Sequence, residues 1–101
     1  MAGTVEIRPG VRWSAAGWLF DWVLSTAASE ISDAEFAGKL REIVDENLGF
    51  LALSEITGDQ RSQFRSVVAV RLSDVAATSW RDFMGREDAL RHLNELRKLI
   101  G

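Results

Sequence analysis

The chain contains one histidine, His92, and two carboxylates lie close to it if the surrounding segment is helical. Helical spacing places Asp88 one turn before His92 and Glu95 nearly one turn after it. A carboxylate next to an imidazole can orient a general base, and one histidine with two carboxylates can also ligate a transition metal. However, the available hydroxyl nucleophiles, Ser73 and Ser79, lie in no nucleophile-elbow pattern, and a histidine paired along its own surface helix has the same spacing. We therefore expect no catalytic residue and no metal site.

Phosphate-binding and thiol chemistry are also missing from the sequence. No glycine-rich stretch has the spacing of a P-loop or of a dinucleotide-binding turn. The chain has no cysteine, which excludes disulfides, thiol catalysis and zinc–thiolate sites. Neighbouring acids such as Asp45–Glu46 and Glu87–Asp88 cannot face one another on a helix, because adjacent residues point in different directions. The sequence therefore predicts a protein that is not an enzyme and holds no cofactor.

Arginine accounts for ten of the twelve basic side chains, and the charge is unevenly distributed. Residues 1–60 carry 4 basic and 10 acidic side chains, whereas residues 61–101 carry 8 basic and 5 acidic ones. The basic second half could form a face that binds acidic groups, or it could be an ordinary solvated surface. The segment 79–100 can be interpreted as a helix-turn-helix that places Arg86 and Arg91 in a DNA groove. Because the final helix is rich in leucine and the first half is acidic, we do not expect a nucleic-acid partner.

Three of the four tryptophans fall between Trp13 and Leu24, in the most apolar segment of the chain. On a helix, the apolar side chains of this segment cover roughly two thirds of the circumference and leave only Asp21 and Ser25 on a polar side. Such a helix must be covered on nearly all sides, by its own domain or by a partner. Four tryptophans are many for so small a core, and tryptophan and arginine are enriched in interface hot spots. We therefore expect a partner-binding surface that includes Trp13, Trp18, Trp22, Trp80, Arg81 and Arg86.

Length and composition predict one globular domain. The chain has 101 residues, of which 47% are hydrophobic and 27% charged, and it contains no linker, repeat or low-complexity segment. The lack of cysteine favours the cytoplasm. Arg8, Arg12 and the apolar stretch that follows them imitate a signal peptide, but Asp21 interrupts the stretch, which is also too short to span a bilayer. We therefore expect a cytoplasmic protein without a membrane partner.

The N-terminal third is predicted to contain an extended arm and one helix. The arm, residues 1–12, includes Thr4–Arg8, which alternates like a strand and ends at a Pro9–Gly10 turn. A single strand must find its partner elsewhere, so this segment is either an edge strand or a simple arm. The first helix is expected from about Ser14, as N-cap, to Ala28.

The second helix has the clearest local signal. Ser32-Asp33-Ala34-Glu35 matches a capping box, with Ser32 as N-cap and Glu35 at the third helical position. Apolar residues then recur at helical spacing on one face, and Gly49 can end the helix in a left-handed conformation. These signals predict a helix over residues 33–48, with a buried face made of Phe36, Leu40, Ile43, Val44 and Leu48.

The region from residue 50 to residue 77 permits two structures. Residues 50–56 could form a short strand or one or two helical turns. Residues 59–77 have apolar side chains at helical spacing, but the β-branched run from Val67 to Val70 also suits a strand. A helix over 59–77 explains more positions than a hairpin of 50–56 with 64–72. We therefore expect the helix and keep the hairpin as the alternative.

The C-terminal part is predicted to be helical. Ser79 resembles an N-cap that begins a short turn ending at Gly85. A final helix follows over residues 86–100, with acidic residues near its start and basic residues near its end, as the helix dipole favours. Its predicted buried face consists of Ala89, Leu93, Leu96 and Ile100, widened by Leu90 and Leu99.

These elements predict a mainly α fold: a compact single-domain bundle of four to six helices, with a short N-terminal strand or extended arm and no second domain. The expected function is a non-enzymatic protein–protein interaction domain, adaptor-like or toxin-neutralising, that associates with itself or binds a larger protein. A small-molecule-binding protein with a pocket lined by tryptophan and arginine is the alternative, in which Arg81 holds an acidic group. A DNA-associated helix-turn-helix factor ranks below both.

Overall fold

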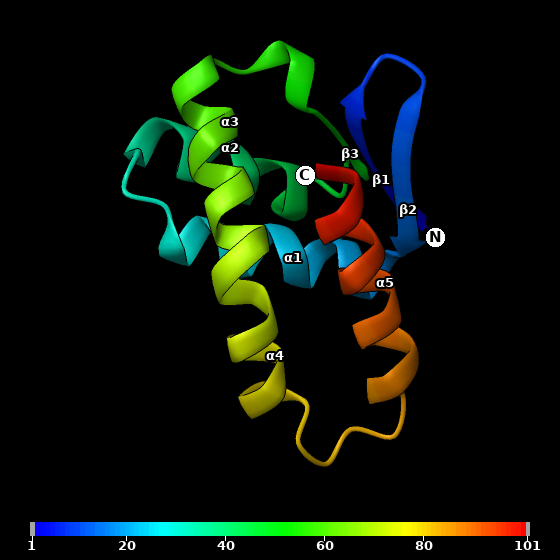
Figure 1. Cartoon of the computed structure of the whole chain (residues 1–101). Helices are drawn as coiled ribbons and strands as arrows, with labels where there is room; N and C mark the ends of the chain where they lie inside the picture. Colours follow the sequence, from blue (N-terminus) through cyan, green and yellow to red (C-terminus); the bar gives the residue numbers. More distant parts are fainter. Residues whose placement is uncertain (1, 101) are drawn as a thin grey trace.

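A three-stranded sheet packs against helices in the computed structural model, which describes residues 2–100 (Figure 1). The first half contains β1 (Ala2–Arg8), β2 (Val11–Ala16), α1 (Gly17–Glu30), α2 (Ala34–Asp45) and β3 (Phe50–Ala52). The second half contains the 3-10 turn η1 (Leu53–Glu55), then α3 (Gly58–Ser66), the π-helical segment η2 (Val67–Arg71), α4 (Leu72–Ser79) and α5 (Arg86–Ile100). The prediction of one compact, mainly helical domain is confirmed, but the sheet is larger than the single strand or arm that the sequence suggested.

The sheet supplies the partner that the N-terminal strand needed. β1 and β2 form an antiparallel hairpin in which Val5 pairs with Trp13, and the turn between them places Gly10 at φ 83°. β3 pairs with the other edge of β1 in parallel, with Leu51 beside Val5, so the strand order is β2-β1-β3. The helices α1 and α2 form the crossover that a parallel pair requires. Residues 2–12 of the predicted arm therefore form β1, the Pro9–Gly10 turn and the start of β2, while Met1 lies outside the described residues.

The first helix begins later than predicted. Ser14 does not cap it, because Ser14 lies in β2, where its hydroxyl forms a hydrogen bond of 3.0 Å with the hydroxyl of Thr4. Along β2 the side chains of Trp13 and Ala15 are buried and those beside them are exposed, which is the two-residue period of a strand. Pairing with β1 therefore outweighs the apolar run that favoured a longer helix, and α1 starts at Gly17.

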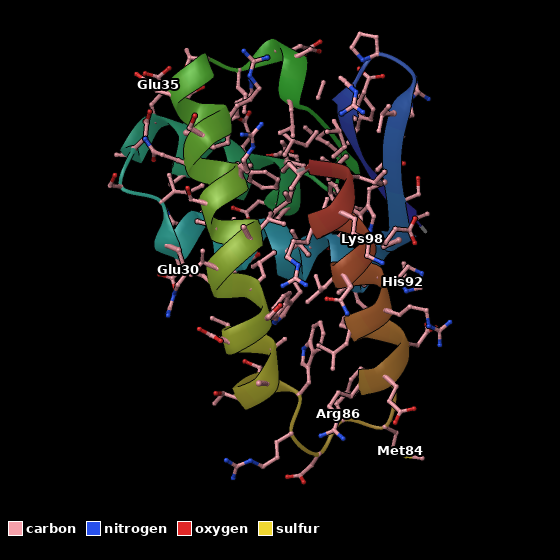
Figure 2. The ribbon with its side chains drawn as sticks, viewed as in Figure 1. Glu30, Glu35, Met84, Arg86, His92 and Lys98 are labelled. Carbon is pink, nitrogen blue, oxygen red and sulfur yellow. The ribbon has the colours of Figure 1, made fainter. Side chains whose placement is uncertain are left out.

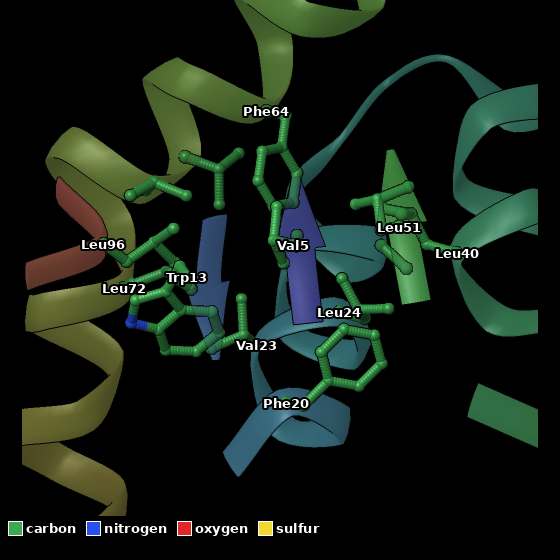
Figure 3. Packing of buried hydrophobic residues seen from close by; sticks show 14 of the residues in the cluster. Val5, Trp13, Phe20, Val23, Leu24, Leu40, Leu51, Phe64, Leu72 and Leu96 are labelled. Carbon is green, nitrogen blue, oxygen red and sulfur yellow. The ribbon is translucent and has the colours of Figure 1, made fainter. Parts of the chain in front are cut away.

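α1 is the central helix of the domain and contacts the sheet, α2 and α4 (Figure 1). Its buried residues are Leu19, Phe20, Val23, Leu24, Ala27 and Ala28. Figure 3 shows some of them among core residues from distant parts of the chain, including Val5, Leu40, Leu51, Phe64, Leu72 and Leu96. Gly3 allows the sheet to approach α1 closely, because a methyl group there would overlap the ring of Phe20. Most of the covering that this apolar helix needs is thus provided within the chain.

A different residue from the predicted one caps α2. The Asp33 carboxylate accepts a hydrogen bond of 3.0 Å from the Phe36 amide, so Asp33 and not Ser32 is the N-cap. Asp33 also accepts a bond from the side-chain amide of Gln60 at 3.4 Å. The hydrogen bond from Phe36, supported by the one from Gln60, lowers the pKa of the Asp33 carboxyl below its usual value.

α2 ends at Asp45, earlier than predicted; Gly49 is left-handed as expected, at φ 67°, but the left-handed residue that closes the helix is Asn47. Asn47 has φ 53°; its amide donates to the carbonyl of Val44, and the following amide, of Leu48, donates to that of Ile43. This is the Schellman arrangement, which satisfies the last carbonyls of a helix. Leu48 was predicted to be buried but is 60% exposed, because it lies in this cap beyond the helix. The buried face of α2 consists of Phe36, Ala37, Leu40 and Ile43, with Val44 partly buried beside them.

Residues 58–79 are helical, so the hairpin alternative was wrong. Thr57 begins the helix with a capping box, in which its side chain and that of Gln60 each accept a backbone amide hydrogen bond. Buried apolar side chains then recur every four residues, at Phe64, Val68, Leu72 and Ala76. In an α-helix that spacing would rotate the apolar face by about 40° per step. The wider turn of η2 counters this rotation and keeps the four side chains on the core side.

The remaining elements divide between confirmed and corrected predictions. Residues 50–56 form β3 and η1, so the strand and the helical turn are both present. Ser79 is not a cap but the last residue of α4, since Trp80 is the C-cap and its amide donates to the carbonyl of Ala76 at 2.8 Å. The short turn predicted to end at Gly85 is present over residues 80–85. α5 has the predicted bounds, with Ala89, Leu93, Leu96 and Ile100 buried. None of the helices formed by residues 2–100 is long and apolar enough to cross a membrane.

Candidate functional site

Aromatic side chains from α1, the end of α4 and the following loop gather in one place. α1 presents Trp18 and Trp22, which are one helical turn apart. Trp80 directly follows α4, and Phe83 lies in the loop before α5. Together with Ser79, these four residues line a groove of about 470 Å³, the aromatic groove.

The rings of the aromatic groove contact one another. The ring centroids of Trp22 and Trp80 are 4.5 Å apart, with an angle of 44° between the planes. The Trp18 centroid lies 5.8 Å from that of Trp80 and 5.3 Å from that of Phe83, with interplanar angles of 70° and 74°. Such edge-to-face contacts are favourable, because the positive edge of one ring meets the negative face of the next. The cluster therefore fastens α1 to the loop between α4 and α5.

Part of this cluster is open to solvent. Trp80 is buried and Trp22 is half-buried, whereas Trp18 is 48% exposed and Phe83 is 44% exposed. The next residue, Met84, is fully exposed. Figure 2 shows Met84 and Arg86 at the end of the molecule where a loop joins α4 to α5. We refer to Trp18, Phe83 and Met84 as the aromatic surface.

Backbone contacts hold the loop of residues 80–85 in place. The Phe83 amide donates to the Trp80 carbonyl at 3.1 Å, and the Arg86 amide donates to the Phe83 carbonyl at 3.2 Å. The guanidinium of Arg86 donates to the carbonyl of Arg81, also at 3.1 Å. A methyl group on Gly85 would lie only 3.0 Å from the Phe83 ring, so the ring packs closely against the loop backbone. These contacts fix the position of Phe83 in the aromatic groove.

The four tryptophans that were predicted to bind a partner occupy different environments. Trp13 is a core residue and not part of a binding surface: it is fully buried, and its indole Nε1 donates to the backbone carbonyl of His92 at 2.8 Å. Its burial follows from its place on the inner face of β2. Trp18, Trp22 and Trp80 are brought together by the fold, and of these three Trp18 is the most exposed.

The two arginines of the predicted surface lie next to the aromatic groove without lining it. Arg86 is engaged with the loop backbone through its guanidinium. Arg81 lines a neighbouring hollow together with Thr78, Ser79, Asp82 and Phe83. An acidic ligand held by Arg81 would therefore lie beside the tryptophans and not among them.

Sequence reasoning missed two residues of this site, Phe83 and Met84. A signal for them was present, since two large apolar side chains stand next to each other in a segment that was predicted to be a short turn ending at Gly85. Large apolar residues in a surface turn are unexpected unless they pack against something. In this chain Phe83 packs against Trp18, and Met84 projects into solvent.

His92 is paired along its own helix. Its Nδ1 lies 2.8 Å from the carbonyl oxygen of Asp88 and 3.8 Å from the Asp88 carboxylate. That carboxylate also lies 3.4 Å from the guanidinium of Arg91, so it is shared between two neighbours. Within residues 2–100, no group of three or more histidine and acidic side chains is arranged to hold a metal ion. This arrangement is an exposed pair along one helix.

Comparison with protein-family models, with curated protein sequences and with solved structures found no match. The function is therefore inferred from the geometry of this chain.

Proposed function

We propose that this chain is a non-enzymatic protein–protein interaction domain whose contact region is the aromatic surface. The observation that supports this most strongly is the exposure of Trp18, Phe83 and Met84 at one end of a domain whose other large aromatic side chains are mostly buried. Their exposed parts amount to on the order of 400 Å², which is within the size of functional apolar patches on single domains. Covering this area would give a partner a substantial hydrophobic contribution to binding.

The composition of the region fits the centre of an interface. Tryptophan and arginine are the residues that most often dominate binding energy, and they act best when surrounding contacts exclude water. Trp18 would be the anchor, while Arg81 and Arg86 lie beside it where a polar rim is expected. A standard interface covers about 800 Å² on each partner, so contacts must extend from the aromatic surface onto α1, the loop and α5.

The proposed partner is a second copy of this chain or a larger protein, in an adaptor-like or toxin-neutralising role. The uneven charge of the sequence, acidic before residue 61 and basic after it, would favour head-to-tail docking of two copies. The lack of cysteine fits a reducing compartment such as the cytoplasm.

Sedimentation velocity of the full chain, from micromolar to millimolar concentration, tests self-association. We expect the wild type to associate and Trp18→Ala to associate at least about tenfold more weakly, the equivalent of losing one hot-spot residue. Leu48→Ala is the matched control, because Leu48 is an exposed apolar residue in the loop between α2 and β3, and it should leave association unchanged. A wild type that stays monomeric throughout contradicts self-association. Binding to a larger protein is tested by a pull-down with immobilised wild-type and Trp18→Ala chains. If both chains retain the same proteins in equal amounts, binding of a larger partner through the aromatic surface is contradicted.

Small-molecule binding is a second candidate, favoured by the volume of the aromatic groove. About 470 Å³ falls within the usual size of a ligand pocket, and four of its five lining residues are aromatic. DNA binding has less support, because Arg91 is paired with Asp88 and the acidic residues Glu87 and Glu95 lie on the same helix.

A further inference from the structure

We infer that β2 pairs with β2 of a second copy of this chain, so that two sheets join in antiparallel register around a two-fold axis at Ser14. The inference goes beyond the proposed function, because it uses the backbone of β2, and no residue of β2 lines the aromatic groove. Addition of a strand to a free sheet edge is a recurring mode of recognition, in which main-chain hydrogen bonds supply the affinity.

β2 is the longer of the two free edges of the sheet. The strand order is β2-β1-β3, so β2 has a neighbouring strand on one side only. Figure 1 shows β2 at the outer side of the molecule, with no strand or helix beyond it in that view. The opposite edge, β3, has three residues and runs directly into the 3-10 turn η1. With its six residues, β2 is the edge that can hold a further strand.

The backbone of Arg12 and Ser14 points to this free edge. The Thr4 amide donates to the Gly49 carbonyl at 2.9 Å, so the N–H and C=O of Thr4 point toward β3 and not toward β2. Thr4 is paired with Ser14, and this pair therefore belongs to the alternate set that exchanges no backbone hydrogen bonds. The N–H and C=O of Ser14, and those of Arg12 two positions earlier, then point away from β1. Within residues 2–100, no hydrogen bond from a loop or a helix cap reaches these groups.

The side chains of β2 leave this edge accessible. Ser14 and Ala16, on the outer face of the strand, are small and exposed. The Arg12 guanidinium lies 3.2 Å from the carboxylate of Glu6 on β1, so the one charged side chain of β2 is directed away from the free edge. Proteins that keep strand edges apart place charges, prolines or bulges on them. β2 contains no proline, and the irregularity of the hairpin falls in β1.

A second copy of β2 supplies the groups that this edge needs. With Ser14 opposite Ser14, the two residues exchange two backbone hydrogen bonds across the axis. Each Ala16 amide can then donate to the Arg12 carbonyl of the other copy. Ala16 is the N-cap of α1, so its carbonyl is used by the helix while its amide stays available. A two-fold axis perpendicular to the sheet also keeps the core-facing side chains of both copies on the same side.

Charge selects this register over its neighbours. With the axis at Ser14, the two Arg12 residues are offset by four positions, roughly 14 Å along the strands. With the axis at Trp13, they would become diagonal neighbours about 7–8 Å apart, and with the axis at Arg12 they would face each other directly. Like charges at such positions are destabilising. Because Glu6 neutralises Arg12 within each copy, the Ser14 register brings no unpaired like charges together.

Sedimentation equilibrium of the Trp18→Ala chain tests this pairing separately from the aromatic surface, because that variant lacks the proposed anchor. We expect a monomer–dimer equilibrium with a Kd below about 1 mM. In this background Ser14→Pro removes the N–H at the axis, and proline is tolerated there because that N–H does not bond to β1. It should weaken dimerisation at least about tenfold, whereas the matched control Ser14→Ala keeps the amide and should dimerise as before.

Two results overturn the inference. One is a Trp18→Ala chain that stays monomeric up to millimolar concentration, which leaves the aromatic surface of the wild type unaffected as a proposal. The other is equal dimerisation of the Ser14→Pro and Ser14→Ala variants. Thermal unfolding of each variant establishes that the fold is intact.

A charge pair at position 14 tests the register and does not depend on proline. Ser14→Glu and Ser14→Lys each place like charges opposite each other across the axis, and each should dimerise about two- to fivefold more weakly than Ser14→Ala. An equimolar mixture of the two variants brings opposite charges together, so it should associate more tightly than either variant alone. A mixture that associates no better than its components contradicts a two-fold axis at Ser14.

Discussion

The indole Nε1 of Trp13 donates a hydrogen bond of 2.8 Å to the backbone carbonyl of His92, joining the N-terminal hairpin to the last helix across 79 positions of sequence. Trp13 is fully buried at this contact. The sequence suggested Trp13 as a partner-binding residue and His92 as a possible general base. In the structure, the two residues form a hydrogen bond that connects β2 to α5. Because the acceptor is the backbone of His92, its imidazole can change without breaking the bond.

Replacing Trp13 should therefore destabilise the whole domain. Trp13→Ala is expected to lower the free energy of unfolding by about 3–5 kcal/mol, as for other large buried aromatic side chains. Trp13→Phe keeps part of the volume but loses the N–H donor, and should cost about 1–3 kcal/mol. Urea denaturation measures both values. Trp18→Phe is the matched control and should cost less than about 0.5 kcal/mol, since Trp18 is half exposed; a similar cost at both positions would contradict the assignment of Trp13 to the core.

Two glycines should respond in opposite directions to alanine. At Gly3 a methyl group would overlap the Phe20 ring, so Gly3→Ala should cost about 1–3 kcal/mol through overpacking. At Gly38, in the middle of α2, an added methyl group would meet no atom within 4 Å, so Gly38→Ala should stabilise the domain by about 0.5–1 kcal/mol. Thermal unfolding of the two variants under the same conditions checks the difference in sign. A stabilised Gly3→Ala protein would show that the sheet and α1 can separate at no cost.

The N-cap assignment predicts a pH-dependent contribution to stability. The pKa of the Asp33 carboxyl is lowered in the folded state, first by the hydrogen bond from the Phe36 amide. The folded state therefore favours the charged form, and the resulting stabilisation is present above the unfolded-state pKa of about 3.9. It is lost as the pH falls through the lower folded-state value. Urea midpoints between pH 7 and pH 2 should show a smaller acid-induced decrease for Asp33→Asn than for the wild type.

Alanine substitutions at Asp33 and Ser32 distinguish the observed N-cap of α2 from the one that the sequence suggested. Asp33→Ala should destabilise the domain at neutral pH, because the Phe36 amide loses its acceptor. Ser32→Ala should have little effect, since Ser32 is exposed and does not cap the helix. The reverse order of these two effects in neutral urea denaturation would favour the capping box that the sequence pattern predicts.

The end of α2 offers a further check of local geometry. Asn47 has φ 53°, a conformation that glycine adopts without steric cost. Asn47→Gly should leave stability unchanged or raise it slightly, whereas Asn47→Ala should cost about 1 kcal/mol, because a Cβ is unfavourable there and alanine cannot form local hydrogen bonds. Thermal unfolding of the Asn47→Gly and Asn47→Ala variants checks which of the two is more stable. Equal stability of the glycine and alanine variants would indicate that the left-handed turn relaxes.

Local patterns in the sequence predicted the elements whose stability is local. The final helix was predicted with its observed bounds, because its apolar stripe, its acidic start and its basic end all lie within one segment. The helical interpretation of residues 59–77 was confirmed for the same reason: five of its six apolar positions are buried and the sixth, Val75, is half-buried. The choice of Ser32 over Asp33 as N-cap failed because both residue types can cap a helix, and the helix begins at Ala34, directly after Asp33.

Contacts between distant segments decided the rest. Whether Trp13 continues a helix or joins a strand depends on β1 lying beside it, and the third strand pairs with β1 after two intervening helices. The aromatic groove likewise joins residues of α1 to residues about sixty positions later, and no periodicity within either segment shows that they meet. The sequence by itself determined a mainly helical domain with one very apolar segment, because burial and helix formation follow from nearby side chains. Only the tertiary structure decided which tryptophans are interior and which are exposed, since strand pairing and ring contacts are set by residues far apart in the chain.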